Sequence, residues 1–165
     1  MNREMESHDM RTKLLVSFLP LDESHLSEKL YCNNIYQLRF FDPDCISQSE
    51  NGSLPLFDDH CQWLKSHIRN HPFYYVLVRE GKFLGYLYGR TESAGIVLSV
   101  AIVKDERMKG LAGLAIDYAL KRHSPSIWYA RIKPRNYASL RCFQRQGFVS
   151  IYESSLIVIL RKETT

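Results

Sequence analysis

The feature that most constrains the fold is an apolar run, a glycine-containing loop and an amphipathic helix that follow one another directly. Residues 95–103 predict a buried strand, and a helical pattern begins at Leu111. A helix start leaves backbone N–H groups without intrahelical partners and carries partial positive charge. The small and basic residues around it predict an anion-binding loop in which a diphosphate approaches the amides closely: Arg107, Lys109, Gly110, Ala112 and Gly113.

The spacing within the loop narrows the choice of ligand. Two common phosphate-binding patterns, G-x-G-x-x-G and G-x-x-x-x-G-K-[ST], are absent. Instead, Arg-x-x-Gly-x-Ala, from Arg107 to Ala112, resembles the acetyl-CoA loop of the GNAT N-acetyltransferases. A second segment, Asn136 to Phe148, resembles the N-x-x-[SA]-x-x-x-[YF]-x-x-x-G-F motif of the same family. The two motifs occur in the expected order, and the resemblance extends over residues 13–162.

The order of the predicted elements indicates one α/β domain, residues 13–162, after a flexible polar tail, residues 1–12. The resemblance implies a GNAT fold, with a mixed, mostly antiparallel sheet of about six to seven strands, flanking helices and a splayed central strand pair. Glu80-Gly81 predicts a hairpin between strands 73–79 and 82–88. The remaining expected strands are 13–19, 95–103, 127–132, 148–152 and 155–160, and the expected helices begin at Asp22, Asp58, Leu111 and Asn136.

Three local patterns add detail to this fold. Prolines, serines and Asn51-Gly52 interrupt residues 41–57, so we expect a loop there. Asp58-Asp59 is expected to cap the helix that follows, and Leu114, Ala115, Tyr118 and Ala119 are expected on the inner face of helix 111–122. The apolar run 155–160 suits either a buried central strand or a strand added to a partner's sheet, and we favour burial within the monomer.

Composition and charge favour a soluble domain with an anionic small-molecule ligand. The net charge of +4 is spread along the chain without a basic run, which disfavours a nucleic-acid-binding protein. No apolar run is long enough to span a bilayer, and no signal peptide is visible. The four cysteines lack metal-ligand spacing, so we expect no metal, reduced thiols and a cytoplasmic protein. A monomer and a homodimer both stay open.

The resemblance implies that an amine attacks acetyl-CoA directly, without a protein nucleophile. The diphosphate would lie on the amides of Met108 through Gly113, and the pantetheine arm would pair with backbone near Ile102 and Val103. Asn136 would bond the CoA chain, cap its helix, or do both. The cofactor-binding residues implied are Ile102, Val103, Arg107, Met108, Lys109, Gly110, Leu111, Ala112, Gly113, Asn136 and Phe143.

The acid that protonates the leaving thiolate departs from the commonest pattern. Many relatives carry a tyrosine where this chain has Phe143, which has no proton to give and also suits a core position. A water, a nearby tyrosine such as Tyr137 or Tyr129, or release of the free thiolate would each serve. Tyr137 is the side chain that we name as the candidate catalytic acid.

The acceptor site is suggested by a third, looser match. Arg39-Phe40-Phe41, Ile46-Ser47 and His60-Cys61-Gln62-Trp63 resemble the signature of the GNAT branch that acetylates nucleotide-linked amino sugars, as in pseudaminic acid and spore-coat polysaccharide biosynthesis. Carried over, Arg39 would bind acceptor phosphate or hydroxyls, and His60 would contact the sugar or relay the amine proton. The expected strand 95–103 holds no carboxylate, so His60, with an ordinary pKa near ~6.5, is also the preferred general base.

Each of these residues also has a purely structural interpretation. Arg39 suits a surface charge at the end of its helix, His60 suits a polar residue in the first turn, and Trp63 is expected in the core. Residues 48–57 look like an insertion beside the acceptor site. A protein N-terminus, a polyamine or an antibiotic amine is the alternative acceptor, and a CoA-binding module without turnover is the alternative of another class.

Overall fold

The computed structural model describes residues 16–22, 24, 29–48, 53–92 and 95–164. Seven strands form one sheet in the order β1-β2-β3-β4-β5-β7-β6, and every neighbouring pair is antiparallel except β4–β5. The strands are β1 Ser17–Pro20, β2 Phe73–Arg79, β3 Lys82–Glu92, β4 Gly95–Ile102, β5 Ile127–Ile132, β6 Val149–Glu153 and β7 Val158–Glu163. The helices are α3 Leu30–Phe40, α4 Pro43–Gln48, α5 Phe57–Asn70, the 3-10 turn η1 Lys104–Glu106, α6 Leu111–Arg122 and α7 Tyr137–Arg145. The expected α/β architecture is confirmed.

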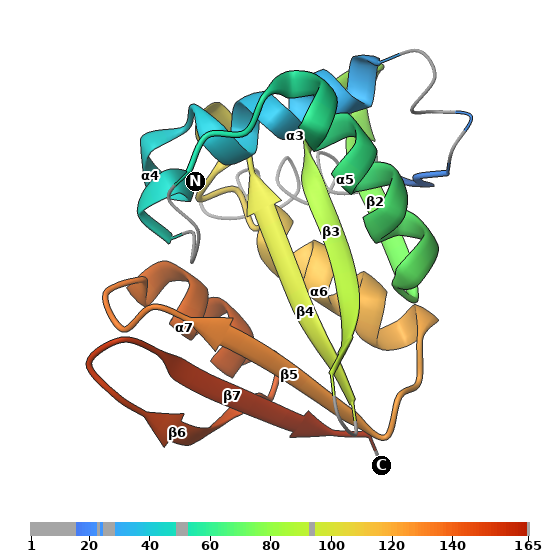
Figure 1. Ribbon diagram of the computed structural model, residues 1–165. Helices are drawn as coiled ribbons and strands as arrows, with labels where there is room; N and C mark the ends of the chain where they lie inside the picture. The colour runs from blue at the N-terminus through green and yellow to red at the C-terminus, as the bar shows by residue number, and fades with distance from the viewer. Residues whose placement is uncertain (1–15, 23, 25–28, 49–52, 93–94, 165) are drawn as a thin grey trace, which may run out of the picture.

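Helices cover both faces of the sheet and bury two separate cores. In Figure 1, α3 and α5 lie over one face of β2, β3 and β4, whereas α6 lies behind the other. Strand side chains alternate between the two faces. Tyr74 and Val76 of β2 therefore pack with α3 and α5, and Tyr75 and Leu77 pack with α6. The alternation thus determines which β2–β4 side chains face α3 and α5 and which face α6.

The parallel pair β4–β5 separates soon after it forms. Only Ile96 with Trp128 and Val97 with Tyr129 are in register, and beyond them the two strand backbones diverge (Figure 1). We call the region between the diverging backbones the notch. Gly95 lets the strands meet at the closed end, because a Cβ there would lie 2.3 Å from the Ile127 carbonyl oxygen. The splayed central pair that the family resemblance implied is thus present, and the two strands are farthest apart at their carboxyl ends.

The segment expected to be a loop contains a short helix. α4 occupies residues 43–48, and the Asp42 Oδ1 atom accepts hydrogen bonds from the amides of Asp44, at 3.0 Å, and Cys45, at 3.1 Å. Proline is compatible with the first helical position, where its missing N–H costs nothing. Reading Pro43 only as a helix breaker was therefore wrong.

Other element boundaries differ in smaller ways. α5 begins at Phe57 with Leu56 at its N-cap, so Asp58-Asp59 lies inside the first turn and the predicted cap is wrong. β7 begins at Val158 rather than at 155, because residues 154–157 form a turn closed by the Ser154 amide and the Ile157 carbonyl oxygen. β7 lies between β5 and β6 and buries Val158 and Leu160, which confirms burial within the monomer for this part of the run, whereas Leu156 is exposed. The tail 1–12 and the 51–52 turn lie outside the described residues.

The cysteines depart from the expected reduced state. Cys32 of α3 and Cys61 of α5 form a disulfide, whereas Cys45 and Cys142 are free thiols. The prediction of reduced thiols is wrong for the bonded pair, since a separation of 29 residues carries no recognisable pattern. Across the described ranges, no group of three or more His, Cys, Asp or Glu side chains is arranged to hold a metal ion. The described helices include none with the length and hydropathy to cross a bilayer.

A substitution at Gly95 tests the closed end of the notch. Gly95→Ala should lower the free energy of unfolding by about 1–3 kcal/mol, because the added methyl group collides with the backbone of β5. Gly113→Ala is the matched control, because its Cβ meets only ordinary contacts at 3.7 and 3.9 Å inside a helix. Urea denaturation of both variants makes the measurement. Equal stability of Gly95→Ala and wild type would contradict this account of strand pairing.

Candidate functional site

The loop between β4 and α6 presents a row of backbone amides. Met108 and Gly110 adopt left-handed conformations, with φ of 62° and 77°, and the Met108 side chain is 95% exposed. Among the described residues, no backbone carbonyl outside α6 accepts a hydrogen bond from the amides of residues 108–113. Unpaired amides at a helix start form a site for an anion. The loop therefore has the geometry that a diphosphate needs.

The cations of this loop are paired with carboxylates. The Arg107 guanidinium contacts Asp42, at 2.8 Å, and Asp44, and the Lys109 ammonium lies 3.3 Å from Glu106. Their charges are thus largely compensated within the protein. The attraction for a diphosphate would come mainly from the main-chain N–H groups and the start of α6.

Glu106 holds the loop in place through ion pairs, a role that no sequence pattern indicated. Its buried carboxylate contacts Arg79 at 2.8 Å and Lys82 at 3.8 Å, besides Lys109. Burial opposes ionisation of Glu106, but the hydrogen bonds and charges of Arg79 and Lys109 outweigh it and hold the pKa below its usual value. Because Arg79 and Lys82 flank the β2–β3 turn, Glu106 joins this hairpin to the loop.

Helix α7 forms the other side of the candidate donor site. The Asn136 Oδ1 atom accepts a hydrogen bond from the Ser139 amide at 3.1 Å, so the capping role of Asn136 is confirmed. Gln146 donates from Nε2 to the Gly113 carbonyl oxygen at 3.3 Å and ties α7 to the first turn of α6. Phe143 is buried against Phe148, as a core residue would be. Tyr137 is 64% exposed at the start of α7.

The three residues suggested for the acceptor side do come together. The Arg39 guanidinium lies 4.7 Å from the centre of the Trp63 ring, and Trp63 stacks on His60 with ring centres 5.7 Å apart. Trp63 is 38% exposed. Its expected position in the core is therefore wrong, because Trp63 serves as a platform for the arginine between α3 and α5.

His60 does not have the properties that were expected of a general base. Its side chain is 1% exposed, and its Nε2 atom has no hydrogen-bond partner. Burial, with a smaller contribution from the charge of Arg39, lowers the pKa of His60 to about 4. The premise of an ordinary pKa is therefore wrong, and the burial argues against direct contact between His60 and an acceptor.

A layer of aromatic and histidine rings extends from His60 along the same side of the sheet. His67 stacks on Trp63 at 4.5 Å and contacts His71 at 3.9 Å and Tyr88 at 4.9 Å, measured between ring centres. Burial, followed by the charges of His71, Arg39 and Arg90, lowers the pKa of His67 to about 3. Neutral histidines are thus part of the packing between α5 and the sheet.

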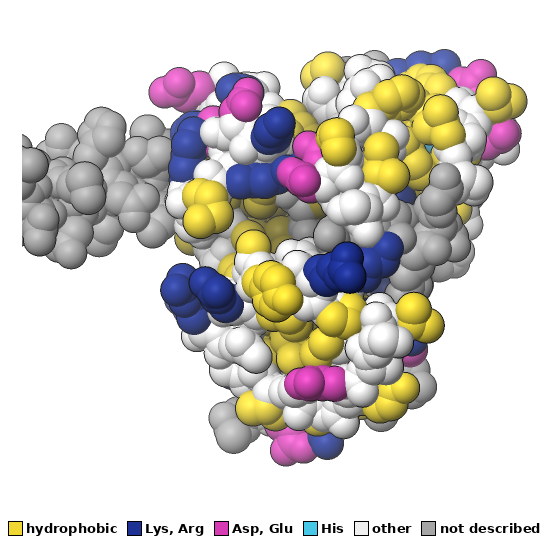
Figure 2. All heavy atoms as spheres, turned by 90° about the vertical axis from the view of Figure 1, so that its left-hand side faces the viewer, with side chains coloured by type: hydrophobic (Ala, Val, Ile, Leu, Met, Phe, Trp, Pro, Cys, Tyr) yellow, Lys and Arg dark blue, Asp and Glu magenta, His cyan; other side chains and the backbone are white. Residues whose placement is uncertain are grey.

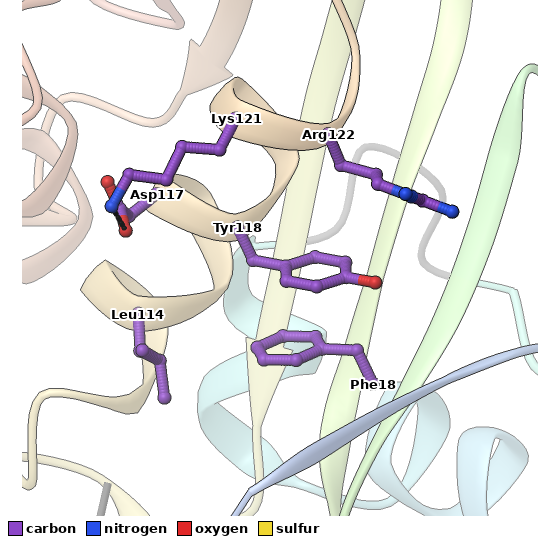
Figure 3. A pocket seen from close by; sticks show the side chains of 6 residues that line it. All are labelled: Phe18, Leu114, Asp117, Tyr118, Lys121 and Arg122. Atoms are coloured by element: carbon purple, nitrogen blue, oxygen red, sulfur yellow. Dashed lines mark hydrogen bonds and ion pairs between the residues drawn. The ribbon is translucent and has the colours of Figure 1, made fainter. Parts of the chain in front are cut away.

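A hollow of about 210 Å³ lies elsewhere, between α6 and β1 (Figure 3). Phe18 and Tyr118 stack there with ring centres 4.0 Å apart. Leu114 and Tyr118 line this hollow and are only half-buried, but both pack against the edge of the core under α6, as their predicted place on its inner face requires. The buried inner face consists of Leu111, Ala115, Ile116 and Ala119. None of the predicted site residues lines the hollow.

A family model matches the sequence, and solved structures match the fold. The family model described as "Acetyltransferase (GNAT) family" matches residues 32–148. An acetyltransferase from Thermus thermophilus superimposes with a TM-score of 0.72 at 16% identity, covering 90% of this chain and 97% of that one. Spermidine N-acetyltransferase from Vibrio cholerae, in complex with CoA and spermine, gives 0.71 at 15%, covering 90% and 95%. The protein yncA from Salmonella typhimurium, with its cofactor acetyl-CoA, gives 0.70 at 16%, covering 90% and 93%. No curated protein matches the sequence.

The buried histidines predict a loss of stability in mild acid. Their folded pKa values lie below the ~6.5 of an unfolded chain. The unfolded chain therefore binds more protons below pH 6.5, and the free energy of unfolding falls as the pH drops towards 4. Each histidine contributes up to ~1.4 kcal/mol per pH unit. Denaturation at pH 7 and pH 5 should show a smaller loss for His60→Phe than for wild type, and equal losses would refute a buried neutral His60.

Proposed function

Because the chain belongs to the acetyltransferase (GNAT) family and is an acetyl-CoA-dependent N-acetyltransferase, we propose that its acceptor is an amino group on a nucleotide-linked sugar. The observation that supports this proposal most directly is the environment of the Arg39 guanidinium. No carboxylate among the described residues forms an ion pair with its guanidinium, which is held over Trp63. A guanidinium that is held in place and has no counter-ion in the described part of the chain suits a phosphate group.

The charge of Arg39 also bears on the alternative acceptors. A polyamine, such as the spermine bound in the Vibrio cholerae structure, carries the same sign of charge and would be repelled. Arg39 precedes Asp42, the cap of α4, by three residues. It therefore lies close in sequence to the helix that is tied to the end of β4 by Arg107. An anionic acceptor bound to Arg39, near the end of α3, would therefore lie close to α4.

On the donor side, we place the acetyl-CoA diphosphate on the amides of residues 108–113. The pantetheine arm would enter the notch beside Ile102 and Val103, where β4 has no partner in β5. Asn136, at the N-cap of α7, and Phe143, within α7, would flank it. The thioester would then lie at the open end of the notch, between the loop and α7.

With the substrates bound in this way, the reaction needs few catalytic side chains. The neutral amine attacks the thioester carbonyl carbon, a carbon–nitrogen bond forms, and the carbon–sulfur bond breaks. The amine loses a proton to water, and the leaving thiolate gains one. We propose the exposed hydroxyl of Tyr137 as that proton donor, and we assign His60 the indirect role of supporting Trp63 and Arg39. Orientation of the two substrates supplies much of the rate.

The tests below also distinguish this function from two alternatives. Acetylation of a protein N-terminus would need room for a peptide beside Arg39, and a CoA-binding module would bind the donor without turnover. We place the enzyme in the cytoplasm, as a monomer or a homodimer.

Gly110→Asp tests the donor site. Gly110→Asp should weaken acetyl-CoA binding at least ~10-fold in calorimetry, because a carboxylate would face the diphosphate. Gly110→Asn is the matched control, since asparagine has the same shape and tolerates the same left-handed backbone. Asparagine should therefore retain most of the affinity. Equal affinities of the two variants would exclude a diphosphate at this loop.

Arg39→Met tests the acceptor. Thiol release should be fastest with a nucleotide-linked amino sugar among a panel that includes spermidine and N-terminal peptides. Arg39→Met should raise the KM for that acceptor about 10-fold or more and leave the KM for acetyl-CoA unchanged, because a charged hydrogen bond contributes ~1.5–3 kcal/mol. Lys65→Met, which removes an exposed cation from α5, should change neither constant. A preference for spermidine, or an unaltered acceptor KM in Arg39→Met, would contradict the proposed substrate.

A further inference from the structure

We propose that Arg107 is a positioning residue that ties α4 to the acetyl-CoA loop, so that binding of the donor orders the helix across the notch. The inference rests on the proposed function only in taking acetyl-CoA as the ligand of the loop. It gives Arg107 a role other than contact with the diphosphate.

One side chain joins three parts of the molecule. The Arg107 Nε atom donates to the Ile102 carbonyl oxygen at 2.9 Å, at the last residue of β4. The two terminal nitrogens of the same guanidinium reach Asp42 and Asp44, at the start of α4. Arg107 itself begins the loop. Its planar fork can satisfy all of these acceptors in one fixed geometry, which a lysine cannot do.

Asp42 receives this contact in a way that also determines α4. Its Oδ1 atom caps the helix, and its Oδ2 atom lies 2.8 Å from Arg107. The Asp42 side chain is 11% exposed, so solvent screens the pair only weakly. Burial opposes ionisation, but the hydrogen bond from Arg107 and the amides of Cys45 and Asp44 lower the pKa of Asp42 on balance. The start of α4 and the start of the loop therefore share one ion pair.

The far end of α4 is attached to the other arm of the notch. The Lys133 Nζ atom donates to the Ser47 carbonyl oxygen at 2.6 Å, and Lys133 directly follows β5. In Figure 1, α4 lies on the left, on the side towards which β4 and β5 diverge. Figure 2, which views the molecule from this side, shows Lys and Arg side chains around an apolar hollow. α4 thus bridges the two strands whose separation forms the notch.

This arrangement predicts coupling between the donor and α4. A ligand on the amides of residues 108–113 restricts the backbone that follows Arg107, and the guanidinium passes that restriction to Asp42. Coupling of this kind is reciprocal, and it amounts to about 5-fold or more in protection or affinity. Any acceptor that contacts α4 would then bind more tightly to the donor complex than to the free enzyme.

Hydrogen exchange of the full chain with and without CoA tests the proposal. In wild type, CoA should slow exchange about 5-fold or more at residues 108–113 and also at residues 44–48. Asp42→Asn keeps an oxygen for the helix cap but removes the charge that Arg107 contacts. In this variant the loop should still be protected by CoA, whereas the protection of α4 should be lost. Asp117→Asn, which breaks a surface pair with Lys121 on α6, is the control and should behave as wild type.

Each alternative outcome has a definite meaning. The proposal is overturned if CoA leaves α4 unprotected in wild type, or if it protects α4 equally in Asp42→Asn. If CoA fails to protect residues 108–113 in wild type, the proposed donor site itself is wrong, and the coupling falls with it. Should Asp42→Asn unfold, Asp44→Asn replaces it, because Asp44 is exposed and its side chain does not cap the helix. Asp44→Asn should reduce the protection of α4 at least twofold, and an unchanged value would count against the proposal.

Discussion

The separation of β4 from β5 is the constraint on which the rest of the site depends. Two parallel strands that pair at only two positions each leave the carboxyl end of β4 without a neighbour on one side. Closed sheets satisfy such backbone groups internally, so an open edge inside a sheet is suited to binding a ligand that supplies the missing partners. Gly95 allows the closed end, and the loop after Ile102 delivers the amide row to the open end.

Beside this notch, the charged side chains of the loop pair with one another, and the main-chain N–H groups are left to bind a ligand. The acidic side chains Asp42, Asp44 and Glu106 engage the cations of the loop, so the groups left for a diphosphate are main-chain N–H groups at the start of α6. On the proposed acceptor side the pattern is reversed: the Arg39 guanidinium lies over Trp63, and none of the carboxylates in the described part of the chain pairs with it. The two sides would thus recognise different anionic groups by different means, by the backbone on one side and by a guanidinium on the other.

The sequence correctly predicted those helices and strands for which the local turn residues and the hydrophobic periodicity indicate the same structure. The Glu80-Gly81 hairpin, helix 111–122 and strand 127–132 follow from local turn and periodicity rules and are confirmed. It missed what depends on distant contacts: α4 is stabilised by Arg107, which lies 63 residues beyond Asp44, and the Cys32–Cys61 disulfide has no sequence pattern. The candidate residues Arg39, His60 and Trp63 were found by resemblance, but burial altered the chemistry of His60, because sequence does not show how deeply a ring lies. The domain limits 13 and 162, and the assigned site residues, stay predictions.

The most direct test of the account is the response of the loop amides to the donor. Acetyl-CoA titrated into ¹⁵N-labelled protein should shift the Gly110, Ala112 and Gly113 amide resonances downfield, as hydrogen bonds to phosphate oxygens form, and all three should saturate with one dissociation constant. Shifts confined to the α6–β1 hollow around Tyr118, with these three amides unmoved, would contradict the claim that this loop binds the diphosphate.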